Sequence, residues 1–218
     1  MMSSSHRFIY LHVPKTGGNT IQSLLLDLSD DRKVCTGHQD GRDRFEVRGP
    51  VTPRKHATLA DYTRRLGMGL DDCRVIISVR HPFERLVSAY FSPHRWMTRS
   101  AADTWEMRPP IWDEALFEDM LQRPEWRPAM HHLDTDEGVR PADHVIHLES
   151  FARDLARTLH ALDVPLAWPG APPRVNRSAA PAEMRKVLSS RTLRDRIEDL
   201  HAADMDHFGY ESYDLAPR

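Results

Sequence analysis

One segment near the N-terminus constrains the fold more than any other part of the chain. Residues 7–28 read RFIYLHVPKTGGNTIQSLLLDL. The apolar run that ends at Pro14 predicts a buried strand, and the isoleucine and leucines at helical spacing after it predict an amphipathic helix. Gly17 and Gly18 allow a sharp turn between the two. Because the unpaired N–H groups that open a helix favour an anion, the segment predicts a strand, a phosphate-binding loop and a helix.

The side chains of this loop also suit an anion. Lys15 adds a positive charge, and the short polar residues that follow it can donate hydrogen bonds. In a Walker A motif the lysine would follow the second glycine, whereas here it precedes both. The candidate binding residues are the whole loop, namely Lys15, Thr16, Gly17, Gly18, Asn19 and Thr20.

A second strand and helix carry another set of candidate ligands. The apolar run at 75–79 is typical of a central parallel strand, and Pro82 suits the first turn of the next helix. Arg80 follows the strand, while Arg85 and Ser88 share one face of the helix. Because open α/β sheets bind ligands at the carboxyl ends of their strands, this group predicts a receptor for a terminal phosphate.

The two motifs resemble those of sulfotransferases that use 3′-phosphoadenosine 5′-phosphosulfate (PAPS). The sequence PKTGG after a strand resembles their 5′-phosphosulfate loop, and the pattern R-x-P-x-x-R-x-x-S-x-Y resembles their 3′-phosphate motif. His81 stands where the family often has Asp or Asn. The resemblance is to the carbohydrate or heparan-type O-sulfotransferase branch. It implies that Arg80 and Ser88 hold the 3′-phosphate and that Lys15 acts at the leaving oxygen.

The resemblance also implies a general base and a loop that folds over the nucleotide. His56 lies upstream of Arg80, where carbohydrate sulfotransferases keep a catalytic histidine, and a neutral imidazole can accept a hydroxyl proton. His38 is the alternative base. The loop over the nucleotide supplies three further candidates, Asn176, Arg177 and Ser178. Whether Arg174 or Arg177 contacts the nucleotide stays open.

The remaining pattern predicts an α/β fold. It is P-loop-like and three-layered, with a mainly parallel central sheet of about four or five strands flanked by helices. The length fits a single domain over residues 1–218, in which residues 92–140 form an acceptor-side insertion.

Thr58 is expected to cap a helix at 59–66. Four tryptophans between 96 and 126 are read as anchors to the core, with stacking on a sugar or base as the alternative. Glu149 is read mainly as a partner of a helix dipole.

The composition limits the partners. A net charge of -2 makes any basic site local, which favours a small anion over nucleic acid. The two cysteines, Cys35 and Cys73, indicate neither a disulfide framework nor a metal site. No apolar segment reaches the length of a membrane span. These features predict a soluble, bacterial-like, cytoplasmic protein.

The expected activity is transfer of the sulfuryl group from PAPS to an acceptor hydroxyl on a carbohydrate or small-molecule natural product. The transfer would be in line, with a histidine base, without a metal, and with 3′-phosphoadenosine 5′-phosphate (PAP) as the product. The alternatives are a P-loop-type nucleotide kinase or phosphotransferase and a non-catalytic nucleotide-binding protein. The acceptor and the oligomeric state stay open.

Overall fold

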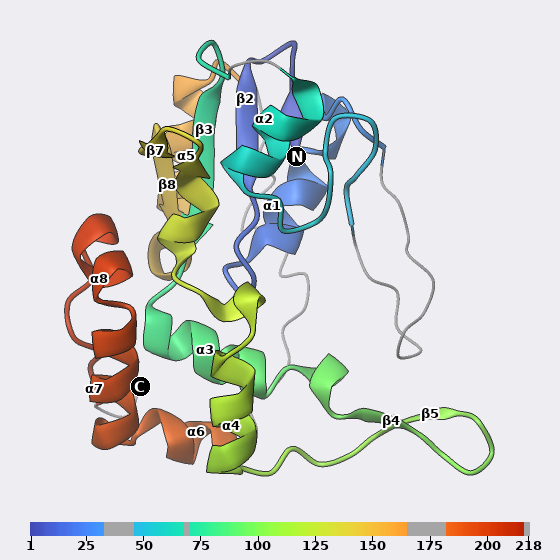
Figure 1. The fold of residues 1–218 in the computed structure, drawn as a ribbon, viewed down its shortest axis with the longest axis vertical. Helices are drawn as coiled ribbons and strands as arrows, with labels where there is room; N and C mark the ends of the chain where they lie inside the picture. Colours follow the sequence, from blue (N-terminus) through green and yellow to red (C-terminus); the bar gives the residue numbers. More distant parts are fainter. Residues whose placement is uncertain (33–45, 68–69, 165–181, 216–218) are drawn as a thin grey trace. The chain divides into compact units, whose positions relative to one another are not determined.

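The computed structural model describes residues 1–32, 46–67, 70–164 and 182–215, and the fold is mixed α/β (Figure 1). The chain divides into two compact units. Their described parts are a sheet unit, residues 1–32, 46–67, 70–80 and 129–164, and a helical unit, residues 81–128 and 182–215.

A four-stranded sheet lies at the centre of the sheet unit, with the order β1-β2-β3-β8. Its strands are β1 (Met2–Ser3), β2 (Phe8–Leu11), β3 (Arg74–Val79) and β8 (His144–His147). The last three pair in parallel, and the short edge strand β1 pairs antiparallel with β2. Nearly every residue of β2 and β3 is buried, as expected for parallel strands covered on both faces. The predicted mainly parallel sheet is confirmed.

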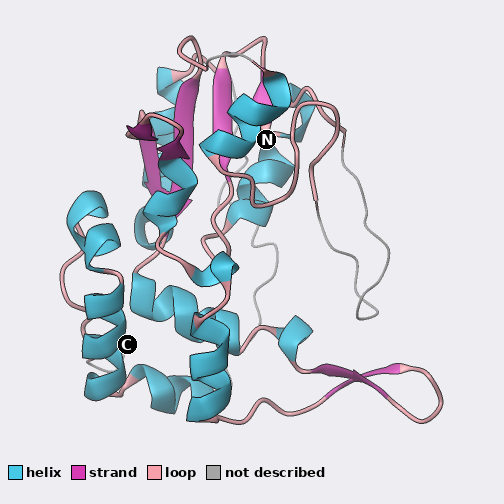
Figure 2. Ribbon diagram, viewed as in Figure 1, coloured by secondary structure: helices cyan, strands magenta, loops and turns pink. Residues whose placement is uncertain are grey.

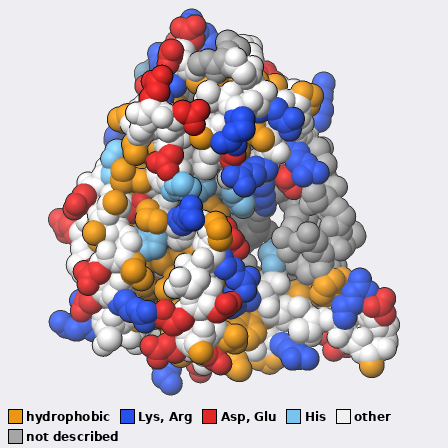
Figure 3. Space-filling view, in the orientation of Figure 1, with side chains coloured by type: hydrophobic (Ala, Val, Ile, Leu, Met, Phe, Trp, Pro, Cys, Tyr) orange, Lys and Arg blue, Asp and Glu red, His pale blue; other side chains and the backbone are white. Residues whose placement is uncertain are grey.

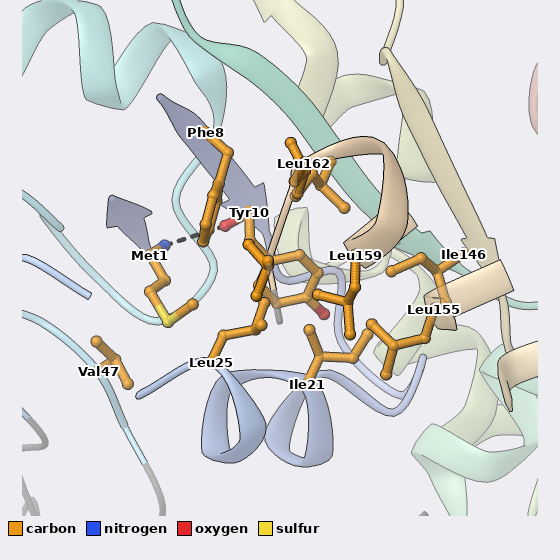
Figure 4. Close-up of a cluster of buried hydrophobic side chains, with 12 residues drawn as sticks. Met1, Phe8, Tyr10, Ile21, Leu25, Val47, Ile146, Leu155, Leu159 and Leu162 are labelled. Atoms are coloured by element: carbon orange, nitrogen blue, oxygen red, sulfur yellow. Dashed lines mark hydrogen bonds between the residues drawn. The ribbon is translucent and has the colours of Figure 1, made fainter. Parts of the chain in front are cut away.

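Helices flank this sheet. The helices of the sheet unit are α1 (Gly18–Leu24), α2 (Leu59–Leu66) and α5 (Phe151–Ala161), with short 3₁₀ turns η1 (Leu26–Leu28), η4 (Ala129–Leu133) and η5 (Leu148–Ser150). Figure 4 shows Tyr10 of β2 buried among Ile21 and Leu25 of α1 and Leu155 and Leu159 of α5. In Figure 1, α2 lies in front of β2. A small hairpin, β6 (Asp134–Thr135) and β7 (Gly138–Val139), completes the unit.

The helical unit has its own apolar core. Its helices are α3 (Pro82–Tyr90), α4 (Glu114–Leu121), α6 (Ala182–Leu188), α7 (Arg191–Leu200) and α8 (Ala202–Phe208), with 3₁₀ turns η2 (Pro93–Arg95) and η3 (Pro124–Trp126). Phe83 and Leu86 of α3 are buried in one cluster with Phe117 of α4, Val187 of α6 and Ile197 of α7. The hairpin of β4 (Met97–Arg99) and β5 (Trp105–Met107) extends away from these helices (Figure 2).

Three of the tryptophans anchor irregular segments, as the anchoring interpretation predicts. Trp96, Trp112 and Trp126 pack against the core of the helical unit. The indole N–H of Trp96 also donates to the carbonyl of Tyr90 at 2.9 Å. Trp105 differs, because it lies in β5 with the Arg99 guanidinium 4.9 Å from the centre of its ring.

Helix α2 begins and ends where the sequence predicts. The Thr58 hydroxyl accepts from the N–H of Asp61 at 3.2 Å, and the Asp61 carboxylate accepts from the N–H of Thr58 at 3.0 Å. This capping box satisfies two donors that the helix leaves unpaired. The helix ends at Gly67, which has a left-handed φ of 63°. The cap therefore fixes the backbone two residues after His56.

The cap gives a stability prediction. Replacing Thr58→Ala removes one half of the capping box and should lower the free energy of unfolding by about 1 kcal/mol. Arg65→Ala is the matched control, because Arg65 is an exposed residue in the last turn of the same helix and should change stability by less than about 0.5 kcal/mol. Urea unfolding of the two variants checks this, and equal losses would contradict the role given to the cap.

Candidate functional site

The phosphate loop follows β2 and has an unusual backbone. Lys15 has a φ of 69°, a left-handed conformation that costs a residue with a side chain roughly 1–3 kcal/mol. Gly17, the N-cap of α1, has a φ of 82° and caps the helix with no side chain. The N–H of Thr20 donates to the Gly17 carbonyl at 3.0 Å, whereas the N–H groups of Gly18 and Asn19 receive no side-chain cap from Gly17, which suits a bound anion. Strain of this kind is typical of a ligand-binding loop.

A chain of buried hydroxyl groups ties this loop to the sheet. The Thr16 hydroxyl donates to the carbonyl of Val13 at 2.8 Å and lies 2.6 Å from the Ser78 hydroxyl. Ser78, on β3, lies in turn 2.6 Å from the hydroxyl of Tyr10, on β2. All three hydroxyl residues are fully buried.

The direction of every bond in this chain is fixed. The Thr16 proton goes to the Val13 carbonyl, which only accepts, so Ser78 must donate to Thr16. The Ser78 proton is then used, and Tyr10 must donate to Ser78. Burial raises the pKa of Tyr10, which keeps the phenol neutral as this direction requires. The Thr16 hydroxyl thus holds the loop, and the backbone is the part of Thr16 left to face a ligand.

Positive charges gather around the loop. Burial, together with the nearby charges of Arg80 and Lys55, lowers the pKa of Lys15 to about 8. Arg80 directly follows β3, which pairs in parallel with β2, so the two loops leave the same edge of the sheet. Figure 3 shows Lys, Arg and His side chains gathered around α2. Like charges that raise each other's energy in this way form a receptor for an anion.

His56 is neutral, with a defined tautomer. Burial lowers its pKa to about 4, against a raising effect from its hydrogen bond to His12. Its Nδ1 lies 2.8 Å from the carbonyl oxygen of His12. Because a carbonyl only accepts, Nδ1 must carry the proton, and Nε2 keeps the lone pair that a general base needs. His56 directly follows Lys55 in the sequence, and both residues belong to the sheet unit, as Lys15 and Arg80 do.

The other predicted site residues lie on α1, on α3 or outside the described residues. Gly18, Asn19 and Thr20 form the first turn of α1, and the Oδ1 of Asn19 is buried without a hydrogen bond to the described residues. Ser88 is half-buried on α3, in the helical unit, whereas Arg80 belongs to the sheet unit. The candidates that lie outside the described residues are His38, Arg174, Asn176, Arg177 and Ser178.

Arg85 differs from the sequence expectation. Its side chain is fully buried in the helical unit, and it donates to the carbonyl of Arg127 at 2.7 Å. Burial lowers its pKa, and the nearby Asp204 opposes this effect. The guanidinium is thus buried and bonded to a backbone carbonyl, and it is not exposed as the predicted phosphate contact would require.

Glu149 is an exposed residue of η5. At the junction between β8 and α5, the Asp154 carboxylate accepts from the Ser150 hydroxyl at 2.5 Å and from the N–H of His147 at 3.1 Å. The sequence analysis missed Asp154 because it lies inside the helix, four positions after the N-cap residue Ser150.

The described residues were also compared with the requirements of a membrane span, a metal site and a disulfide. None of their helices is both long and apolar enough to cross a membrane. Among the same residues, no group of three His, Cys, Asp or Glu side chains is arranged to hold a metal ion. Cys73 is a free thiol, and Cys35 lies outside the described residues.

The hydroxyl chain gives a prediction about stability. Ser78→Ala leaves the buried Tyr10 hydroxyl without an acceptor and should cost about 1–3 kcal/mol. Tyr10→Phe removes only the first donor and should cost less, about 1 kcal/mol. The double variant should recover part of the Ser78→Ala loss, because no buried donor is then left without an acceptor. Urea unfolding measures all three, and a larger loss in Tyr10→Phe than in Ser78→Ala would contradict the assigned direction.

Comparison with known proteins places the chain in a family. A search of curated proteins and a search of solved structures each give no match. The family model described as "Sulfotransferase family" matches residues 1–211, almost the whole chain, and so spans both units and the loop that carries Lys15. Together with the mainly parallel α/β sheet, this match establishes that the chain belongs to the sulfotransferase family.

Proposed function

We propose that this protein is a PAPS-dependent O-sulfotransferase that acts on a hydroxyl of a carbohydrate or small-molecule acceptor. The observation that carries the proposal is the convergence of three cations in the sheet unit. Arg80 and Lys55 are close enough to lower the pKa of Lys15, which lies in the phosphate loop. The neutral His56 is adjacent to Lys55 in the same unit. Membership of the sulfotransferase family supports the same reaction class.

The residues of the loop fit the phosphosulfate end of the donor. A bound anion would relieve the repulsion among Lys15, Arg80 and Lys55. The backbone N–H groups of Gly18 and Asn19, in the first turn of α1, add donors that need no side chain. Thr16 contributes through its backbone, because its hydroxyl is held by Val13 and Ser78.

PAPS supplies an activated sulfuryl group, whose transfer joins the sulfur to the acceptor oxygen and breaks its bond to the bridging phosphate oxygen. The Lys15 ammonium stabilises the negative charge that develops on that bridging oxygen. His56 takes the acceptor's proton on Nε2, since Nδ1 already carries a proton donated to the His12 carbonyl. His38 is the alternative base and is compared directly with His56 by His→Gln substitution at each position.

The rest of the donor site is proposed from the sequence motifs. Arg80 and Ser88 would hold the 3′-phosphate, and the segment with Asn176, Arg177 and Ser178 would fold over the nucleotide. The same reading proposes a cytoplasmic enzyme that needs no metal and has residues 92–140 on the acceptor side of a single domain, 1–218.

Donor binding gives the first functional prediction. Calorimetric titration with PAP in the absence of metal should detect binding, and Lys15→Ala and Arg80→Ala should each weaken it by at least about tenfold, because each removes a charged contact. Arg157→Ala is the matched control, since Arg157 is an exposed arginine on α5 and should leave binding unchanged. Binding of ATP that requires Mg²⁺, with no binding of PAP, would instead favour a kinase.

The lowered pKa of Lys15 predicts how donor binding depends on pH. Lys15 is charged below about pH 8 and loses its proton above that value. Since an anion binds the charged form, PAP affinity should fall by up to about tenfold per pH unit above pH 8, compared with its value at pH 7. Lys15→Arg should remove this fall, because a guanidinium stays charged. An equally steep fall in Lys15→Arg would assign the effect to another group.

The pKa of His56 predicts the acid side of the activity profile. With a pKa of about 4, the imidazole stays neutral at pH 5–7, so kcat/KM should fall only as the pH drops toward about 4. An ordinary histidine would give a fall near pH 6.5. His56→Gln should lower kcat by about 100-fold or more, with less than a threefold change in PAP affinity. Full activity of His56→Gln, with loss in His38→Gln, would move the base to His38.

A further inference from the structure

His12 is a buried histidine that the sequence reasoning did not single out. It follows β2, and its side chain is only 5% exposed. Its Nδ1 lies 3.0 Å from the Oε1 of Gln22, a fully buried residue of α1. The Gln22 oxygen accepts, so Nδ1 donates and the orientation of the ring is fixed from the helix side.

The other side of His12 contacts His56. The two ring centroids are 4.6 Å apart with an interplanar angle of 71°, an edge-to-face arrangement. In addition, the backbone carbonyl of His12 accepts from His56 Nδ1 at 2.8 Å. One residue therefore contacts the candidate base through both its ring and its backbone.

The His12 ring also explains why a glycine stands at position 18. A Cβ atom added to Gly18 would overlap the His12 ring. The backbone of Gly18 is not left-handed, so the ring, and not the backbone, excludes a side chain there. Gly17 presents the opposite case, because its φ of 82° requires glycine whatever space surrounds it.

We infer that His12 is a positioning residue whose ring sets the spacing between the first turn of α1 and His56. The inference rests on the proposed function, in which the first turn binds the donor and His56 activates the acceptor. The spacing of these two groups decides whether the acceptor oxygen lies in line with the sulfuryl group. A displacement of about 1 Å in such a geometry can cost about 100-fold in rate.

The test is a double-mutant cycle between positions 12 and 18. In the wild-type background, Gly18→Ala forces the first turn away from the His12 ring and should weaken PAP binding by at least about tenfold. In the His12→Ala background the space is free, and the same substitution should weaken PAP binding by less than about threefold. Gly17→Ala is the control, since its backbone strain should weaken binding equally in both backgrounds.

Activity separates a positioning role from a structural one. His12→Ala should lower kcat by about 10–100-fold while PAP affinity changes by less than about threefold. The double variant should regain donor binding but not kcat, because the ring contact that positions His56 is lost and only the backbone carbonyl of residue 12 still accepts from His56 Nδ1. If His12→Ala does not fold, His12→Asn replaces it in the kcat measurement, as an amide can still donate to Gln22.

Two results would overturn the inference. One is a Gly18→Ala loss that is the same in both backgrounds, and the other is a folded His12 variant with wild-type kcat. Failure of the proposed function would look different, because the wild type itself would then not bind PAP. In that case the unfolding temperatures of the same single and double variants would be compared. Non-additive changes at positions 12 and 18 would then test the contact between them without any ligand.

Discussion

The parallel pairing of β2 with β3 is the constraint on which the candidate site depends. Leu11 pairs with Ile77, so the segments that follow the two strands leave the sheet at the same edge. Lys15 lies on one segment and Arg80 on the other, and their charges repel, which contributes to the lowered pKa of Lys15. Hydrogen bonding within the sheet thus holds two cations closer together than their charges alone would favour, and a bound anion would lower that energy.

Groups around these cations are kept neutral. The loop is joined to the sheet through three hydroxyl groups in a single donor order, and burial keeps the Tyr10 phenol protonated. Burial likewise lowers the pKa of both His12 and His56. Protonated imidazoles would add to the repulsion around Lys15, so neutral histidines leave the positive charge to lysine and arginine. The same neutrality leaves Nε2 of His56 able to accept a proton.

Features that depend on local sequence were predicted well. The strand at Phe8–Leu11 and the helix after Thr58 follow from apolar periodicity and a capping residue, both of which act over a few residues. Ser78 bonds to Thr16, although the two residues are 62 positions apart in the sequence. The His12 ring lies against Gly18 because the turn between them brings the two together. No local sequence pattern marks either contact. Arg85 fits a phosphate motif in sequence, but its side chain is fully buried in the helical unit and donates to the Arg127 carbonyl. The roles of Ser88 and Asn176 remain predictions from motifs.

The most direct test of this account is the pKa of Lys15 itself. Titration of the protein with ¹³C-labelled lysine, followed by NMR and assigned with Lys15→Arg, measures it in the wild type and in Arg80→Gln. The account predicts a pKa of about 8 in the free protein, a higher value in Arg80→Gln, and a rise when PAP is added. A pKa at the ordinary lysine value, near 10.4, that neither Arg80→Gln nor PAP changes would contradict the convergence of cations at this edge of the sheet.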